Sequence, residues 1–416
     1  MSPLASYRRL FELAGPTYVV VAFLARLPLA MSQLGTLLLV SEATGSYGLG
    51  GLAAGALAVA NAVGAPFAGS LADRIGQRRV VLVQSLAGAA SLTLLVALVH
   101  VGASDLAVVG AAALAGLTMP QVGPLARARW RPITARTGPQ QRRLVDVAFS
   151  YEGAADEASF AIGPALVGLG VVAVSPGGAL LLAAGLLAAF GTAFALHRTA
   201  RVVRGSGLTR PTGRLMTPVL LVLATAQLLI GCLFGATQTG TTVLATAAGH
   251  PGFAGLVHAT LGLGSALAGI ATAFIPERFG PERRILVAAS ALLVLSVPLL
   301  FVDGLPALTA AVALLGCAVA PFMIGVFTLA ERVVAPARVA TAMTMLASAT
   351  GIGYALGSTV AGRLADQHGH SAAFAVTLSA MGLAVVLVAL SQRRFRTALD
   401  QVRGPVEVAE PALVSA

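Results

Sequence analysis

Twelve long apolar segments dominate the sequence and restrict how the chain can fold. A helix that crosses the roughly 30 Å hydrocarbon core of a bilayer needs about 20 predominantly apolar residues. Hydrophobic residues make up 57% of the chain and charged residues only 10%, against roughly 25% charged residues in soluble domains. The sequence therefore predicts an all-α integral membrane protein. We place its membrane helices at 16–40, 48–71, 80–101, 106–126, 144–174, 178–197, 216–245, 253–275, 285–302, 306–330, 340–362 and 371–391.

The basic residues exclude several kinds of chemistry. All 27 are arginine, because the sequence contains no lysine. A P-loop nucleotide site needs a lysine on the phosphates, and a Schiff-base site needs an amine side chain, so neither is present. The net charge of +11 does not indicate a nucleic-acid-binding face, because aromatic residues are only 5% and the arginines lie in short clusters between apolar runs. We expect no nucleic-acid partner.

The positions of the arginines predict the orientation of the chain. Only Arg26, within the first segment, and Arg363, near the outer end of the eleventh, lie outside the clusters. The positive-inside rule places such clusters in the cytoplasm, and their alternation requires an even number of spans. We expect a multi-pass protein of the cell (inner) membrane with both termini cytoplasmic. The clusters lie near 8–9, 74–79, 127–143, 198–214, 278–284, 332–338 and 393–403.

The two halves of the sequence repeat each other. Met119-Pro120 in the fourth segment corresponds to Ala320-Pro321 in the tenth, and Gly163–Gly168 in the fifth corresponds to Gly357–Gly362 in the eleventh. Parallel repeats with a central substrate site are a transporter architecture. We predict two pseudo-symmetric six-helix bundles at 1–197 and 216–392. A cytoplasmic central loop at 198–215 joins them, and a cytoplasmic C-terminal tail follows at 393–416.

The turn between the second and third segments carries a motif of glycines, one aspartate and three arginines. Gly69 permits close approach of another helix, and Asp73 suits the positive N-terminal end of a neighbouring helix. Gly76 permits a tight turn, and the arginines suit contact with anionic lipid at the cytoplasmic face. The motif reads Gly69-Ser70-Leu71-Ala72-Asp73-Arg74-Ile75-Gly76-Gln77-Arg78-Arg79.

This motif resembles the loop signature G-x-L-a-D-r-x-G-r-r-r of the major facilitator superfamily. With twelve segments in two halves, the resemblance covers most of the chain. It implies the major facilitator fold and a secondary transporter that works by alternating access. It also implies that Asp73 contacts the start of the eleventh helix and helps to latch the outward-facing state.

The fifth segment resembles the antiporter motif of the superfamily's drug exporters, g-x-x-x-G-P-x-x-G-G. Gly163, Pro164 and Gly168 follow it, whereas Ser159 replaces the leading glycine and Leu169 splits the closing pair. Small residues here suit a pliable hinge or tight helix packing. The resemblance implies a relation to the drug/proton antiporter branch, although the fourth-segment arginine of such exporters is absent from 106–126.

Charged residues within predicted membrane helices cost about 2.5–3.5 kcal/mol each on insertion scales, so each needs a reason. Arg26 lies about ten residues into the first segment, and Asp156 and Glu157 lie at comparable depth in the fifth, which also holds Glu152 on the same face as Asp156. The proton affinity of a carboxylate depends on its burial and on a neighbouring arginine, so we predict a proton-coupling site in the first half. The alternative is a static ion pair between the first and fifth helices. The residues are Arg26, Glu152, Asp156 and Glu157.

Other polar residues within the segments are candidate substrate contacts. In this superfamily the first, fourth, seventh and tenth helices line the cavity. The alternative role for each glutamine is hydrogen bonding between helices. The candidates are Arg26, Gln33, Gln121, Gln227 and Gln238.

The sparse polar lining predicts proton-coupled efflux of a small apolar or amphipathic compound. The alternative on the same fold is an importer, or an exporter of a sugar or other metabolite. An intramembrane enzyme is a third hypothesis, which the absence of His-Glu-x-x-His, of Gly-x-Ser-x-Gly and of any His/Cys cluster disfavours. We expect no cofactor and no metal. The expected partners are protons, a small-molecule substrate and the lipid bilayer, and we expect a monomer.

Overall fold

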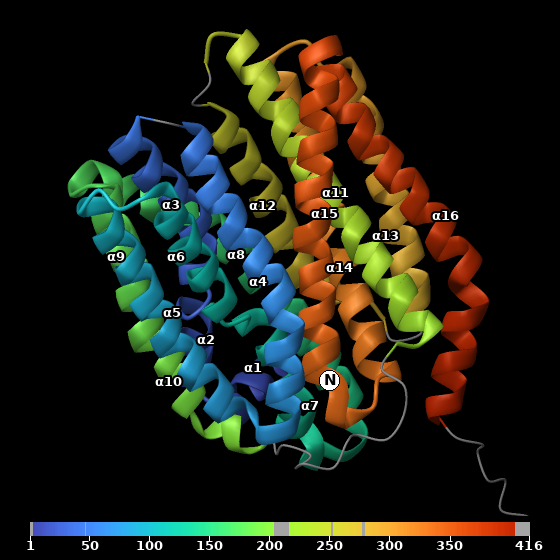
Figure 1. The fold of residues 1–416 in the computed structure, drawn as a ribbon. Coiled ribbons are helices and arrows are strands. Elements are labelled where there is room, and N and C mark those ends of the chain that lie inside the picture. The colour runs from blue at the N-terminus through green and yellow to red at the C-terminus, as the bar shows by residue number, and fades with distance from the viewer. Residues whose placement is uncertain (1–2, 46, 204–215, 251–252, 277–278, 404–416) are drawn as a thin grey trace, which may run out of the picture.

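The computed structural model describes residues 3–45, 47–203, 216–250, 253–276 and 279–403. All regular secondary structure in these ranges is helical. Figure 1 shows two groups of helices side by side, α1–α10 from the first half of the chain and α11–α16 from the second. Residues 204–215 of the predicted central loop, residues 277–278 and the predicted tail beyond Arg403 lie outside the described part of the chain.

The first group begins with a helix that precedes the predicted first membrane helix. Its elements are α1 (Pro3–Ala14), α2 (Pro16–Leu24), α3 (Leu27–Thr44), α4 (Tyr47–Ile75), α5 (Gln77–His100), α6 (Asp105–Thr118), α7 (Val122–Thr134), η1 (Ala135–Gln140), α8 (Gln141–Ala173), α9 (Pro176–Leu186), η2 (Leu187–Gly191), α10 (Thr192–Leu196) and η3 (Arg198–Arg201).

The second group contains fewer and longer helices. Its elements are α11 (Pro218–Ala247), α12 (Phe253–Thr272), α13 (Pro281–Ser296), η4 (Val297–Phe301), α14 (Leu305–Val333), η5 (Pro336–Arg338), α15 (Val339–His368) and α16 (His370–Arg403). The helix α16 thus extends into the segment that the sequence predicted as a tail.

Eleven segments of the described chain are long and apolar enough to cross a membrane. One of them, Asp105–Ala173, is 69 residues long and contains α6, α7 and α8. Since α7 packs back against α8 after the short turn of η1, this segment accounts for two of the predicted spans. Every predicted apolar segment is therefore helical. Large apolar side chains such as Val172 and Leu390 are exposed, as a lipid-facing surface requires.

The first span is interrupted where α2 gives way to α3. The helix α2 ends at Leu24, and α3 begins at Leu27 with Pro28 in its first turn. Proline has no backbone N–H, so the hydrogen-bond ladder cannot continue through it. Arg26 lies in the interruption.

The fourth span is interrupted in a similar way between α6 and α7, around Pro120. Asn61 of α4 donates hydrogen bonds from Nδ2 to the carbonyl oxygens of Gly116 and Met119, at 3.0 and 3.1 Å. These bonds supply a side-chain donor to backbone carbonyl groups at the break, as a broken helix inside a membrane requires.

The fourth span is also longer than its predicted end at 126. The helix α7 continues to Thr134 and buries Arg127 and Arg129, which the charge pattern assigned to a cytoplasmic cluster. Partners distant in sequence compensate both side chains. Asp156 pairs with Arg127, and the amide oxygen of Gln77 accepts a hydrogen bond from Arg129.

Glycines bring corresponding helix pairs of the two groups into close contact. Gly116 of α6 lies against the backbone of Leu57 in α4, and Gly316 of α14 lies against that of Leu261 in α12. A side chain at either glycine would overlap the facing backbone. The pairs α3–α8 and α11–α15 correspond to each other in the same way. This pairing places the first and fifth spans together, which positions the charged residues described next.

Candidate functional site

Arg26 lies at the centre of a buried cluster of charges in the first group of helices. Its Nη1 donates to the carbonyl oxygen of Ala22 at 3.0 Å, which occupies a backbone acceptor left by the break between α2 and α3. Its Nη2 pairs with Glu152, and its Nε donates to Asp156 at 2.8 Å. The side chain is only 3% exposed. All three nitrogens of the guanidinium group therefore have partners.

The two carboxylates that bind Arg26 each have a second partner on α7. The indole Nε1 of Trp130 donates to Glu152 at 2.6 Å, and Arg127 donates to Asp156 at 2.7 Å. Glu152 and Asp156 are four residues apart on α8, so one face of that helix presents both. Two arginines thus balance two carboxylates.

Glu157 differs from its neighbours on α8. No ion pair involves its carboxylate within the described part of the chain. It is half-buried and lies at the contact between α8 and α12, where its carboxyl approaches Ser265. The interface with the second half therefore holds a carboxylate in excess of the balanced pairs.

Sequence reasoning missed Arg127 as a member of the cluster. Besides pairing with Asp156, its guanidinium carbon lies 4.3 Å from the ring centroid of Phe327 in α14, so it contacts both halves. Such a cation–π contact is attractive because the ring face is electronegative. The sequence feature that could have indicated it is Pro120. This proline breaks the helix within the fourth span, and the span continues beyond it to Arg127.

The residues of the glycine–arginine motif lie at one end of the molecule. Asp73 accepts hydrogen bonds from the backbone N–H groups of Ala340 and Thr341, at 3.1 and 2.8 Å, and from the Thr341 hydroxyl at 2.6 Å. This is the start of α15, so the expected contact is present. Gly69 lies against the same turn of α15, and Gly76 takes a φ of +90°, which glycine adopts without strain. Arg74, Arg78 and Arg79 are exposed.

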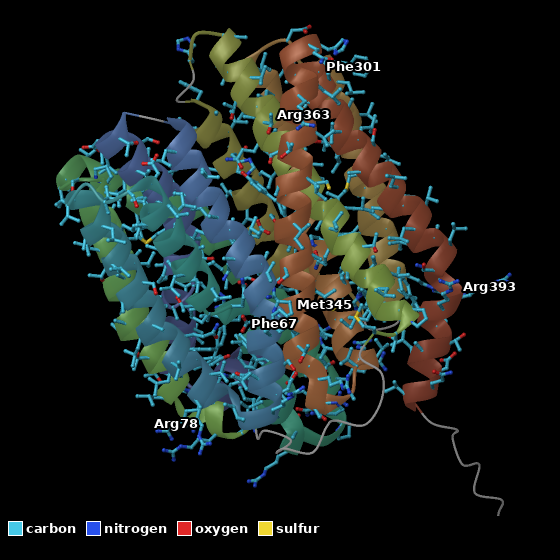
Figure 2. The ribbon with its side chains drawn as sticks, viewed as in Figure 1. Phe67, Arg78, Phe301, Met345, Arg363 and Arg393 are labelled. Carbon is cyan, nitrogen blue, oxygen red and sulfur yellow. The ribbon has the colours of Figure 1, made fainter. Side chains whose placement is uncertain are left out.

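We call the end that carries Arg78 the arginine-rich end (Figure 2). Phe301 and Arg363 lie at the opposite end in the same view. Arg363, which the sequence placed outside the arginine clusters and near the outer end of the eleventh segment, thus lies at the end opposite the arginine-rich end.

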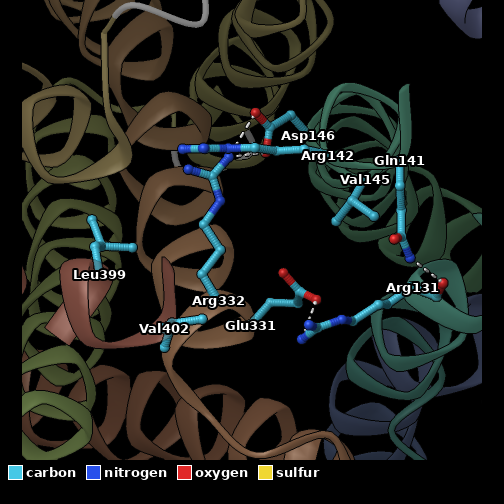
Figure 3. Close-up of a pocket in the computed structure, with 9 residues that line it drawn as sticks. All are labelled: Arg131, Gln141, Arg142, Val145, Asp146, Glu331, Arg332, Leu399 and Val402. Carbon is cyan, nitrogen blue, oxygen red and sulfur yellow. Dashed lines mark hydrogen bonds and ion pairs between the residues drawn. The ribbon is translucent and has the colours of Figure 1, made fainter. Parts of the chain in front are cut away.

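Ion pairs join the two halves at the arginine-rich end. Arg332 of α14 pairs with Asp146 of α8, with N–O distances of 2.5 and 2.8 Å, and Arg131 of α7 pairs with Glu331 of α14 at 3.4 Å. Figure 3 shows these pairs around a cavity of about 200 Å³. Arg143 adds a hydrogen bond of 2.6 Å to the carbonyl oxygen of Ala273, after α12. With Asp73, these contacts close the molecule at this end.

No hydrogen bond joins the four candidate glutamines to one another within the described part of the chain. Gln121 donates to Asn61 at 2.5 Å, Gln227 accepts from Thr350 at 3.2 Å, and Gln238 accepts from Tyr354. Each of these partners belongs to the same half as its glutamine. The exposed side chains among the four are Gln33 and Gln238.

The antiporter-like motif lies on α8, which continues through Pro164. Gly163 packs against Ala30 of α3, whereas no atom lies near the space that a Gly168 side chain would occupy. One glycine of the motif therefore serves close packing of the first and fifth spans, and the other does not.

These helices, with charges buried between broken spans and the halves joined at one end, define a multi-pass membrane protein built from two similar bundles. The model of the Major Facilitator Superfamily matches residues 18–305 and 241–410. The chain belongs to the major facilitator superfamily, a family of membrane transporters.

Solved structures of the same fold are distant in sequence. The human organic anion transporter MFSD10 (TETRAN) is 20% identical with a TM-score of 0.69, covering 89% of this chain and 98% of that one. A bacterial homologue of the iron transporter ferroportin in an outward-facing state is 16% identical with a TM-score of 0.69, covering 91% and 98%. A variant of the E. coli fucose:proton symporter FucP is 15% identical with a TM-score of 0.65, covering 92% and 99%. No curated protein matches the sequence.

Proposed function

We propose that this transporter exports a small apolar or amphipathic compound in exchange for protons, by alternating access. The observation that carries the proposal is the cluster of Arg26, Arg127 and three α8 carboxylates, which includes a surplus carboxylate at the contact between the halves. Buried charges of this kind mark proton and ion pathways in membrane proteins. The membrane-facing surface and the sparse polar interior favour a cargo with few charges.

The proposal includes an orientation. Since arginine clusters favour the cytoplasmic side, we place the arginine-rich end in the cytoplasm, with both termini. The contacts of Asp73, Asp146 and Glu331 then hold the cytoplasmic side closed, so this arrangement corresponds to the outward-facing state. In that state the Asp73 contact with α15 acts as a latch, and rocking of the halves breaks it.

The proposed substrate contacts are Gln33 and Gln238, because their side chains are exposed. Gln121 and Gln227 are secondary candidates, because Gln121 is half-buried and Gln227 is buried. Arg26 serves coupling rather than direct substrate contact, because its nitrogens are all occupied.

Flux in proteoliposomes tests the proposal, with ethidium as an amphipathic probe and an imposed pH gradient. We expect a proton gradient to drive ethidium movement, and the Asp156→Asn/Glu157→Gln double variant to abolish that coupling. Glu12→Gln, an exposed carboxylate on α1, is the matched control and retains coupling. Ethidium movement that is unchanged when the gradient is collapsed would contradict the proposal.

The second candidate function is transport of a sugar or other metabolite. The observation that favours it is that fold neighbours include proteins described as a fucose:proton symporter and an organic anion transporter. A thermal-shift screen of the purified protein against apolar drugs, sugars and organic anions separates the two candidates. Stabilisation by sugars or organic anions alone favours the second.

A further inference from the structure

One face of α12 forms the contact between the second half and α8. Residues 258, 262, 265 and 269 are spaced by four, three and four positions, so they lie on the same side of the helix. Gly269 lies against Ala154 of α8, and Gly262 lies against Glu157 and Ala161. This α8–α12 interface, seen near the middle of Figure 1, moves whenever the halves rock against each other.

Two buried polar atoms on this face of α12, and one carboxylate of α8, lack the partners that a static role would supply. Ser265 Oγ and His258 Nδ1 are buried and form no hydrogen bond with the described residues. Glu157 has no ion pair there. Buried polar atoms without partners are rare in folded proteins, and two on one helix face, beside a carboxylate without an ion pair, call for an explanation.

His258, Glu157 and Ser265 follow one another along the axis of α12, so they mark a candidate proton route from the opposite end of the molecule to the charge cluster. The helix α12 begins at Phe253, and His258 follows about 7.5 Å further along the axis. Gly262, which touches Glu157, is one turn beyond His258, and Ser265 is about 4.5 Å beyond Gly262. His258 thus lies between the opposite end of the molecule and Glu157.

Glu157 is the carboxylate of the cluster that can gain and lose a proton without breaking an ion pair. Arg127 and Asp156 are the charged groups that act on it electrostatically, and these two are already paired with each other. On α12 itself, His258 is the titratable side chain of the helix. Glu42 of α3 and Arg136 of η1, on elements that also pack against α8, are exposed. The remaining charged groups on these elements have partners in the arginine-rich end, on α1 or in the charge cluster. They are Arg8, Arg9, Glu12, Arg26, Arg129, Arg131, Glu331 and Arg332.

We propose that Glu157 is the residue that binds the transported proton, with Ser265 as its partner across the halves and His258 as the relay from the opposite end. A proton moves from the His258 imidazolium through water in the α8–α12 interface to the Glu157 carboxylate, which leaves a neutral imidazole and a neutral carboxyl group. Water at the opposite end then reprotonates the imidazole. Glu152 and Asp156 keep their ion pairs throughout. This inference rests on the proposed function and assigns its proton site.

Infrared difference spectroscopy of the purified full-length protein in lipid nanodiscs tests the proton site without any substrate. We expect a buried carboxyl C=O band that appears and disappears between roughly pH 5 and 9, where perturbed carboxyl groups and histidine titrate. Glu157→Gln abolishes this band, whereas Glu12→Gln leaves it. Ser265→Ala keeps the band and shifts its frequency, because the carboxyl loses its neighbouring hydroxyl. Absence of the band in the unmodified protein, or its persistence in Glu157→Gln, would overturn the assignment.

The relay is tested by the rate at which the same band shifts on transfer to D₂O. His258→Gln retains the band but slows its isotope shift by roughly 100-fold, the scale of a lost general acid–base step. An unchanged rate in His258→Gln overturns the relay. Because this readout needs no cargo, its outcome is separable from that of the export proposal. A titrating Glu157 without gradient-driven flux contradicts export, and flux without a titrating Glu157 contradicts the proton site.

Discussion

At the scale of residues, the charge cluster separates into fixed and changeable members. Glu152 accepts from Arg26 and Trp130, and Asp156 accepts from Arg26 and Arg127, so both lose strong interactions if neutralised. Glu157 loses none. Three carboxylates within six residues of one helix therefore have different physical roles, which only their partners distinguish.

The difference predicts the stability of two isosteric variants. Glu152→Gln leaves part of the Arg26 charge uncompensated in a buried site, which costs about 3–5 kcal/mol. Glu157→Gln changes the same functional group on the same helix without breaking an ion pair, so we expect only a small change in the free energy of unfolding. Thermal unfolding followed by size-exclusion chromatography in detergent measures both. Equal destabilisation of the two variants would contradict the division.

At the scale of elements, breaks and small residues determine where the helices meet. The interruption between α2 and α3 lets Arg26 use the Ala22 carbonyl as well as the carboxylates of α8. Gly163 packs against Ala30 of α3, about two turns of α8 beyond Asp156. This close packing holds α8 near enough to Arg26 for the charge pairs to form. The helix packing and the charge cluster thus depend on each other.

The two glycines of the antiporter-like motif should respond differently to alanine. In Gly163→Ala the added methyl group overlaps Ala30, and we expect destabilisation of about 1–3 kcal/mol from overpacking. In Gly168→Ala the methyl group meets open space, and the substitution is neutral or stabilises by about 0.4–1 kcal/mol through the unfolded state. Melting temperatures of the two variants provide the comparison. A hinge that needs glycine at 168 would instead show lost transport in Gly168→Ala at normal stability.

At the scale of the whole molecule, hydrogen bonds and ion pairs gather where the halves meet at the arginine-rich end. Asp73 binds the start of α15, Asp146 binds Arg332, and Glu331 binds Arg131. These contacts link α4, α7 and α8 of the first half to α14 and α15 of the second. Their loss should shift the equilibrium between the two access states, because they form only when this end is closed.

Spin labels test that shift. Cysteines at 78 and 393 report the arginine-rich end, and cysteines at 106 and 301 report the opposite end, on positions that are exposed in the structure. Asp73→Asn with Asp146→Asn should lengthen the 78–393 distance and shorten the 106–301 distance. Asp105→Asn, at the start of α6, is the control and should change neither. An unaltered distance distribution in the double variant would rule out the latch.

The orientation has its own test. In a variant without Cys232 and Cys317, a single cysteine at 78 should be protected from a membrane-impermeant thiol reagent in intact cells and labelled in inverted vesicles. A cysteine at 301 should show the reverse, because the proposed orientation places Phe301 outside. Labelling of position 78 in intact cells would reverse the orientation.

Much of the architecture could be predicted from the chain alone. The apolar runs identified every membrane helix, because a segment in lipid must satisfy its own backbone and so reveals itself by length and hydropathy. The glycine–arginine motif identified the family. The burial of Arg127 could not be predicted, because a hydropathy pattern cannot distinguish an arginine in water from one that Asp156 neutralises inside the bundle.

The sequence by itself determined a helical membrane protein with two repeated halves, a family signature, and charges at matching depth in the first and fifth spans. The tertiary structure decided which charges pair, that Arg127 joins them, and that Glu157 faces the other half. The physical reason is that the free-energy cost of burying a side chain depends on its residue type, which can be read from the sequence. Compensation depends on the partner that folding places within a few ångströms, and here those partners are 29 to 130 residues apart.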